Sequence, residues 1–472
     1  MHRSLATSWS DPALADATIL SWRAAAAAFC LSALLCWPML VFGGPIVFFD
    51  TGLYIGNGAE LWSRFADALG WSGSVGDDAA RPEIGQLRSV SYALWSFVTS
   101  RTFLWARAPA LLQTWMTILM LMVLIPRGTL RRPLWMILSA MCLAAVTTLP
   151  WYASYAMPDL LAATLVLFYA GLATRLDRAG WGWRVFLLAV GSFAVSSHYG
   201  NIPLAAGLAV IVVVLRLARG RLAAWHVAWA VLPILATLAL NSAGSQVSGG
   251  GGSSIAPKRL PILLARSVAD GPALDYLSGA CPAGADLAIC RLMPEIPGDV
   301  ETFLWSDAGI QGLDAEGLAA IRDEEIAILW HAFLAYPGRQ AEALLGNATR
   351  QLFEVGTDDL YPALRGDQEE MRAYRDSFTI LAVFDPVVKL GTFLLCAFAL
   401  WLALARIYTR EEALALAVCL AGILGNAAIF GGLSAPVDRY QSRLVWVVPA
   451  LALLAWSRHA AGRSIRHRGR SP

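Results

Sequence analysis

The sequence predicts an all-α membrane protein with about ten transmembrane helices, amphipathic surface helices and an extracytoplasmic loop region. Composition is the first reason: 57% of the 472 residues are hydrophobic and 15% are charged, whereas soluble proteins carry about 25% charged residues. The second reason is that long apolar stretches recur, and about 20 apolar residues suffice for one helix to cross a bilayer. No basic run with interleaved aromatic residues is present, so we do not expect nucleic acid as a partner.

Ten apolar stretches are the predicted spans. They cover residues 24–43, 108–125, 133–149, 158–174, 184–198, 202–217, 223–241, 378–404, 412–431 and 443–457. The first stretch is not followed by a small-residue cleavage site, which predicts that it stays in the protein as a signal anchor.

The distribution of arginine predicts the orientation of these spans. Two or three Arg lie in each of the connections 126–133, 175–184, 216–222 and 405–411, and five Arg follow Ser457. The alternate short loops, near 150–157 and 199–201, contain none. Positive residues are retained on the cytoplasmic side, so we expect both termini to be cytoplasmic.

This topology divides the chain into four parts. We expect a bundle of seven spans in residues 1–241, an extracytoplasmic region in 242–377, the last three spans in 378–457 and a basic cytoplasmic tail in 458–472. The outer loop 44–107 and the region 242–377 together hold 26 of the 34 acidic residues, as expected for chain exposed to water.

Cysteine usage agrees with an outer region in an oxidising compartment. Five of the seven cysteines lie in apolar stretches, where a thiol behaves as a small hydrophobic group. Cys281 and Cys290 lie in the region 242–377, and we predict a disulfide between them.

The outer segments contain predicted helices and loops. Residues 56–69 and 91–103 have amphipathic patterns typical of helices that lie along a membrane surface. Residues 70–86 and 271–313 have the Gly, Asp and Pro content of loops, and helices are predicted over 316–333 and 338–355. The Gly- and Ser-rich stretch 242–254 is expected to be flexible, either as a mobile lid or as a slack tether.

Polar residues gather at the predicted outer ends of the spans. Asp50 directly follows the first span. A carboxylate at the edge of a membrane is costly, so it is expected there only if it is hydrated or has a function. Asp159, in Met157-Pro158-Asp159, opens the fourth span and is either a functional acid or a cap that complements the helix dipole. His198, in the turn Ser197-His198-Tyr199-Gly200-Asn201, is either a ligand or a structural turn residue.

Two further features carry positive charge. Arg439 and Arg443 contradict the charge rule for outer loops, so they need a local partner, either a phosphate or a carboxylate such as Asp438. Asp385 and Lys389 share one face of the eighth span and form either an internal ion pair or, through Lys389, a contact to a phosphate.

These motifs resemble the GT-C polytopic glycosyltransferases, which use polyprenyl-phosphate sugars, as the aminoarabinose and mannosyl transferases do. The resemblance rests on Asp50 in Phe49-Asp50-Thr51-Gly52-Leu53-Tyr54, on Pro158-Asp159 with the order of Asp and Pro inverted, and on Arg439-Tyr440 before a last span that contains Pro449. It covers most of the chain in topology but only about twenty residues in motifs.

The resemblance implies roles for the candidate residues. Asp50 would be the general base, Asp159 would bind the acceptor or a metal, and Arg439 would hold the lipid phosphate with help from Lys258 and Arg259. The remaining implied substrate-binding residues are Tyr54, His198, Lys389 and Tyr440. No cofactor is certain; a divalent cation held by Asp50, Asp159 and His198 stays an open alternative.

The expected function is transfer of a sugar from a polyprenyl-phosphate donor to an extracytoplasmic glycan, lipid or protein at the outer face of a plasma membrane, the bacterial inner membrane by the resemblance. The partners would be that donor, that acceptor and membrane lipid. Two alternatives remain: a flippase or transporter of a lipid-linked sugar, and a polysaccharide ligase or polymerase. Polar residues at span ends, together with the lack of an internal repeat, favour an enzyme over a transporter.

Overall fold

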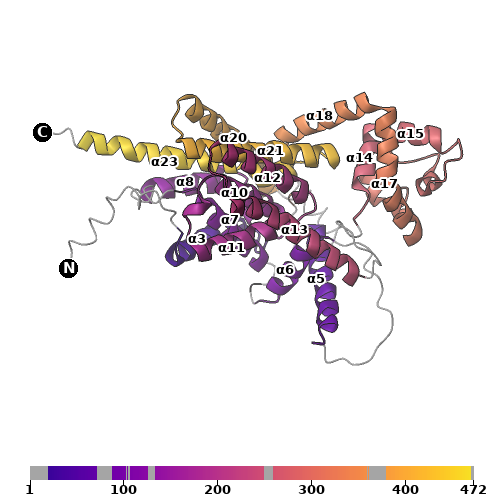
Figure 1. Ribbon diagram of the computed structural model, residues 1–472, viewed down its shortest axis with the longest axis horizontal. Helices are drawn as coiled ribbons and strands as arrows, with labels where there is room; N and C mark the ends of the chain where they lie inside the picture. The colour runs from indigo at the N-terminus through magenta and orange to yellow at the C-terminus, as the bar shows by residue number, and fades with distance from the viewer. Residues whose placement is uncertain are drawn as a thin grey trace.

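The computed structural model describes residues 20–71, 88–102, 104, 107–125, 133–248, 259–358, 360 and 379–468. Every regular element in these residues is helical, and the only β-type pairing among them is an isolated bridge between Ile46 and Tyr155. Figure 1 shows a bundle of long helices, with α14, α15 and α17 grouped beyond one end of it and α18 leading from that group to the bundle. The all-helical fold class is therefore confirmed.

The bundle is built from helices that coincide closely with the predicted apolar stretches. They are α3 (Trp22–Leu35), α4 (Pro38–Val41), α7 (Arg107–Val123), α8 (Pro133–Val146), α9 (Leu149–Ala153), α10 (Asp159–Thr174), α11 (Trp181–Ser196), α12 (Asn201–Ala218), α13 (Ala224–Val247), α20 (Thr379–Leu404), α21 (Arg410–Asn426), the π-helical turn η5 (Ala427–Gly431), α22 (Asp438–Val445) and α23 (Val447–Arg468).

Four helical segments are long and apolar enough to cross a membrane, which supports the membrane class. They are Asn201–Ala218, Ala224–Val247, Leu381–Leu404 and Arg410–Gly431. Five other apolar helices in the described residues have 10–17 residues, so the number of ten spans stays a prediction.

The remaining helices belong to the outer segments. They are α5 (Phe49–Ala68), α6 (Val90–Ser100), α14 (Ile262–Asp270), α15 (Pro272–Ala280), η3 (Ala288–Leu292), α16 (Val300–Trp305), η4 (Ile310–Gly312), α17 (Ala315–Ala335) and α18 (Pro337–Phe353). Helices α14 to α17 enclose a second hydrophobic core that includes Leu264, Phe303 and Ile328. The predicted disulfide joins Cys281 to Cys290 beside this core.

Three local predictions are wrong. The stretch 24–43 is divided between α3 and α4, because Pro38 cannot continue a helix and starts a new one. The surface helix predicted over 56–69 begins earlier, at Phe49, so Asp50 lies in the first turn of α5. Part of the loop-like stretch 271–313 is helical, in α15 and α16.

The start of the predicted flexible stretch 242–254 is also helical, since α13 continues to Val247. Gly244, within this helical part, has a packing role, because a Cβ at this position would overlap the side chain of Val90 at the start of α6. Composition alone could not distinguish a glycine that permits close helix packing from one that permits flexibility. Residues 249–258 lie outside the described residues, so the choice between a lid and a tether stays open.

Helix α10 is the centre of the bundle. All of its residues from Asp159 to Thr174 are buried, and it packs against α7, α11, α12 and α21. At its C-terminal end, Arg216 of α12 donates hydrogen bonds to the carbonyl of Leu172 (3.0 and 2.7 Å). The positive side chain thereby satisfies a carbonyl oxygen that has no partner within the helix and faces the negative end of the helix dipole.

Close packing of α13 on α6 predicts that Gly244→Ala destabilises the protein by about 1–3 kcal/mol, because the added methyl group overpacks against Val90. Gly207→Ala in α12 is the matched control, since no atom lies within 4 Å of its added Cβ. Thermal unfolding of the purified variants in detergent measures both effects. Equal midpoints for the two variants would show that Gly244 is not needed for packing.

Candidate functional site

Asp50 and Arg88 form the first part of the candidate site. Asp50 is 8% exposed, and its Oδ1 lies 2.7 Å from Nη2 of Arg88, which precedes α6. Its position in the first turn of α5 places the carboxylate at the positive end of a helix dipole. The Arg88 guanidinium also lies 6.0 Å from the ring centroid of Trp305 in α16. Arg88 was not predicted, because it follows a Gly- and Asp-rich stretch of sequence and no spacing links it to Asp50.

Asp159 and two arginines form the second part. Asp159 Oδ1 at the start of α10 lies 3.6 Å from Nε of Arg439 and 3.5 Å from Nη1 of Arg443. The two arginines are four residues apart in α22, so both project from one face of that helix. Arg443 is 1% exposed and also donates from Nη2 to Oδ1 of Asn426 (2.9 Å).

Asp159 is therefore more than a helix cap, and the carboxylate that faces Arg439 and Arg443 is Asp159. Asp438, the alternative carboxylate partner named for these arginines, has its Oδ2 3.5 Å from Lys389. The reason is helical geometry: adjacent residues in a helix point about 100° apart, so Asp438 and Arg439 face different neighbours.

The two parts of the site are neighbours. The Arg439 guanidinium carbon lies 4.6 Å from the ring centroid of Phe48, two residues before Asp50. Tyr54, one turn after Asp50, is buried against Tyr92 with ring centroids 4.9 Å apart. Burial raises the pKa of the Tyr54 phenol, and the charge of Asp50 raises this pKa further. Asp50, Arg88, Asp159, Arg439 and Arg443 are called the arginine cluster below.

His198 lies beside this cluster, in the connection between α11 and α12. Its Nδ1 accepts a hydrogen bond from the backbone N–H of Gly200 (3.1 Å), and its ring centroid is 5.2 Å from that of Phe430 in η5. Burial lowers the pKa of His198 well below its usual range, and the charges of Arg443 and Arg439 lower it further. These contacts are those of a neutral structural turn residue.

Tyr440 lies between the two arginines of α22. Its ring centroid is 5.2 Å from the guanidinium carbons of both Arg439 and Arg443, and 4.7 Å from the ring of Phe430. Aromatic faces attract cations, so Tyr440 and Phe430 hold the guanidinium groups in place.

The arginine cluster has more positive than negative charge. Three guanidinium groups face two carboxylates, and the contacts of Arg439 and Arg443 to Asp159 exceed the roughly 2.7–2.9 Å of a close charge-assisted hydrogen bond. Nε of Arg443 has no hydrogen-bond partner among the described residues. Buried positive charge is costly unless it is paired, so the cluster is suited to an anion.

Lys389 is the centre of a neighbouring cluster in which negative charge exceeds positive charge. Its Nζ lies 2.8 Å from Asp385, 2.9 Å from Asp358 and 3.5 Å from Asp438. The internal ion pair between Asp385 and Lys389 is therefore present, and two more carboxylates share the ammonium group. This arrangement does not favour Lys389 as a phosphate ligand.

The structure does not assemble the metal site suggested by sequence. Asp50 and Asp159 face arginines, and His198 Nδ1 binds a backbone amide. Among the described residues, one group of three carboxylates lies within 4.8 Å of one another, those of Asp358, Asp385 and Asp438. The ammonium group of Lys389 pairs with these carboxylates, in the position that a metal ion would otherwise take.

The two basic residues predicted to assist Arg439 do not contribute a described contact to the arginine cluster. Lys258 lies outside the described residues. Arg259 forms an ion pair with Glu325 of α17, whose Oε1 also accepts the backbone N–H groups of Leu263 (3.0 Å) and Leu264 (3.1 Å). Glu325 is 1% exposed, so Arg259 neutralises a buried carboxylate of the outer helices.

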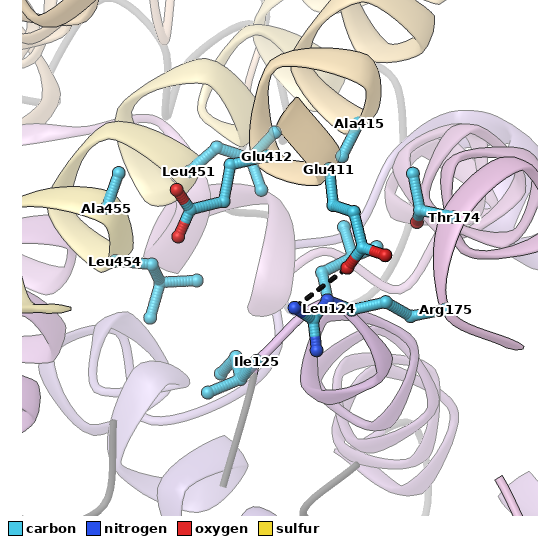
Figure 2. Close-up of a pocket in the computed structure, with 10 residues that line it drawn as sticks. All are labelled: Leu124, Ile125, Thr174, Arg175, Glu411, Glu412, Ala415, Leu451, Leu454 and Ala455. Atoms are coloured by element: carbon cyan, nitrogen blue, oxygen red, sulfur yellow. Dashed lines mark ion pairs between the residues drawn. The ribbon is translucent and has the colours of Figure 1, made fainter. Parts of the chain in front are cut away.

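A cavity lies at the far end of α10 and is separate from the arginine cluster. Figure 2 shows Arg175 and Glu411 facing each other in it. Nη2 of Arg175 lies 2.9 Å from Oε2 of Glu411. Arg175 follows the last residue of α10, whereas Asp159 is the first, so the two ends lie about 24 Å apart at 1.5 Å per residue. The lining residues are Leu124, Ile125, Thr174, Arg175, Glu411, Glu412, Ala415, Leu451, Leu454 and Ala455.

Comparisons of the chain with protein-family models, with curated proteins and with solved structures found no match. The site is therefore interpreted from its own geometry. Its defining features are an acid held by Arg88 and a buried arginine pair beside it.

The environment of His198 predicts a pH effect on stability. Its folded-state pKa is lowered, so below about pH 6.5 the unfolded chain binds a proton that the folded protein excludes, and stability falls as the pH falls. His198→Gln should therefore lose less stability between pH 7.5 and pH 5.5 than the wild type. His331→Gln, at an exposed position in α17, is the control. Thermal unfolding midpoints of the three proteins at the two pH values test this prediction. An identical loss of stability in all three proteins would contradict it.

Proposed function

We propose that this chain is a membrane glycosyltransferase that moves a sugar from a polyprenyl-phosphate donor to a glycan, lipid or protein acceptor. In this proposal the chain crosses a plasma membrane, the bacterial inner membrane, ten times, with both termini in the cytoplasm and the arginine cluster at the outer face. The observation that carries the proposal is that a carboxylate, Asp50, and a buried arginine pair lie in one cluster. Transfer from a lipid phosphate needs both groups.

Asp50 is the proposed general base. As the acceptor hydroxyl attacks the anomeric carbon of the sugar, its proton passes to the Asp50 carboxylate. Arg88 binds Oδ1 and leaves Oδ2 as the oxygen that can accept this proton.

Arg439 and Arg443 are the proposed ligands of the phosphate. When the bond between the anomeric carbon and the phosphate oxygen breaks, the oxygen keeps the electron pair and polyprenyl phosphate leaves as an anion. Guanidinium groups held in a buried site stabilise that charge without first having to reorganise. Apolar grooves between helices are suited to the polyprenyl tail.

The charge balance supports a monophosphate donor. A polyprenyl phosphosugar is a phosphodiester with a single negative charge, and the arginine cluster has one more guanidinium than carboxylates. A diphosphate-linked donor carries a further negative charge, and the arginine cluster has no further guanidinium group to balance it.

A flippase for a lipid-linked sugar is the second candidate. The observation that favours it is that α20 carries Asp385 and Lys389 and contains Pro386 within the helix, as broken spans of transporters do. The two functions differ in their products: a transferase makes a new glycosidic bond, whereas a flippase moves an unchanged lipid between leaflets. Product analysis in vesicles loaded with a single lipid-linked sugar separates them.

Asp50→Asn should reduce sugar transfer by about 100-fold or more, the range typical of a lost general base, while donor binding changes little. A synthetic polyprenyl-phosphate sugar is the donor for this assay. Asp323→Asn, at an exposed position in α17, is the matched control and should transfer at the wild-type rate. Normal transfer by the Asp50 variant would rule out its role as the base.

Arg439→Ala should weaken binding of polyprenyl phosphate by about 10-fold or more, because a charge-assisted hydrogen bond contributes about 1.5–3 kcal/mol. Arg350→Ala is the control, since Arg350 has a side chain 69% exposed on α18. Titration of short-chain polyprenyl phosphate into protein in lipid nanodiscs measures both affinities. Unchanged binding by the Arg439 variant contradicts the phosphate site.

A further inference from the structure

Helix α18 brings one polar side chain from the outer region into contact with the helix that carries the arginine pair. Gln351 is 0% exposed; its Nε2 donates to the carbonyl of Val437 (2.8 Å), and its Oε1 accepts the N–H of Val437 (3.1 Å). One planar carboxamide thus binds both backbone polar groups of a single residue, which fixes the position and direction of the chain at that residue.

Val437 is the residue at which this constraint matters most. It is the N-cap of α22, in extended conformation, and its side chain provides no capping hydrogen bond. Helix α22 is eight residues long, so the conformation at its first residues sets its rotation about its own axis. A rotation by one residue is about 100° and would turn Arg439 and Arg443 away from Asp159.

The contact between α18 and the bundle is tight around Gln351. A Cβ on Gly431, in the π-helical turn η5, would lie 2.6 Å from the Cβ of Gln351 and 2.7 Å from the carbonyl oxygen of Asn347. The absence of a side chain at Gly431 lets α18 lie directly on η5. Phe430, the preceding residue of η5, contacts His198 and Arg443.

The same face of α18 also contacts the outer helices. Asn347, one turn before Gln351, donates from Nδ2 to both carboxylate oxygens of Asp270 at the end of α14 (3.0 and 3.2 Å). Asp270 is in turn bound by Arg266 of the same helix, at 2.5 Å. A continuous set of contacts therefore leads from α14 through Asn347 and Gln351 to α22.

We propose that Gln351 is a positioning residue for the phosphate site: it holds α22 in the rotation that directs Arg439 and Arg443 toward a bound phosphate, and Asn347 makes this rotation depend on the outer helices. The proposal rests on the proposed function, because it assigns the arginine pair to a phosphate. Beyond the proposed function, it states that the outer helices influence the affinity for the donor through the contact between Asn347 and α14.

Binding of decaprenyl phosphate to the full-length protein in lipid nanodiscs tests the proposal. Gln351→Met keeps the approximate size of the side chain and removes both hydrogen bonds, and it should weaken binding by about tenfold. Gln351→Glu keeps the acceptor for the Val437 N–H but sets a carboxylate oxygen against the Val437 carbonyl, so it should also weaken binding. Arg350→Ala, on the adjacent exposed residue, should bind as the wild type does. Asn347→Ala should weaken binding by about threefold, since it breaks only the contact with α14.

A positioning role also predicts coupling. In the Arg439→Ala background, Gln351→Met should weaken binding less than it does in the wild type, because only Arg443 is then left to be positioned. General damage to the fold would weaken binding equally in both backgrounds, and that result would overturn the proposal. If Gln351→Met does not fold, Gln351→Glu takes its place in the same double-mutant comparison.

The outcomes separate this inference from the proposed function. If Arg439→Ala binds decaprenyl phosphate as tightly as the wild type, the phosphate site itself is wrong. If Arg439→Ala loses binding while Gln351→Met and Gln351→Glu bind normally, the phosphate site stands and the positioning role is wrong. If Asn347→Ala binds decaprenyl phosphate normally while Gln351→Met binds it weakly, the proposed influence of the outer helices on donor affinity is wrong.

Discussion

The burial of α10 is the constraint on which the rest of the bundle depends. A helix without access to water leaves its terminal polar groups and any charged end residues to be satisfied by neighbouring helices. Arg216 of α12 binds a carbonyl at the C-terminal end, and Glu411 of α21 pairs with Arg175 just beyond it. At the N-terminal end, Asp159 faces Arg439 and Arg443 of α22. The same ion pairs that complete α10 therefore fix the helices around it, and the candidate site is one end of this arrangement.

Much of the architecture was predictable because it depends on local patterns. Apolar stretches indicated the bundle helices, the amphipathic pattern indicated α5 and α6, and the two cysteines of the polar region indicated the disulfide. The arginine distribution predicted that Asp50, Asp159, His198 and Arg439 lie on one side of a membrane, and the structure brings these four residues close together.

The unpredicted features depend on contacts between distant segments. The Lys389 cluster joins Asp385 of the same helix to Asp358 and Asp438, and Gln351 binds Val437, which is 86 residues away. Arg88 likewise meets Asp50, which is 38 residues away in the sequence. No periodicity links such residues, because their juxtaposition follows from how helices pack. Gly244 and Gly431 show the same limit: their function is to let another helix approach, and only the packed structure reveals which glycines do this.

The short length of α10 has a consequence for the depth of the site. Its 16 residues extend about 24 Å, whereas the hydrocarbon core of a bilayer is about 30 Å thick. With α10 centred in that core, Asp159 and the arginines around it would lie about 3 Å inside its edge, below the level of the lipid headgroups. A phosphate that reaches them must be drawn down from the surface while its polyprenyl chain stays in an apolar environment. Water-soluble sugar phosphates lack such a chain, so depth itself would select a lipid-linked donor.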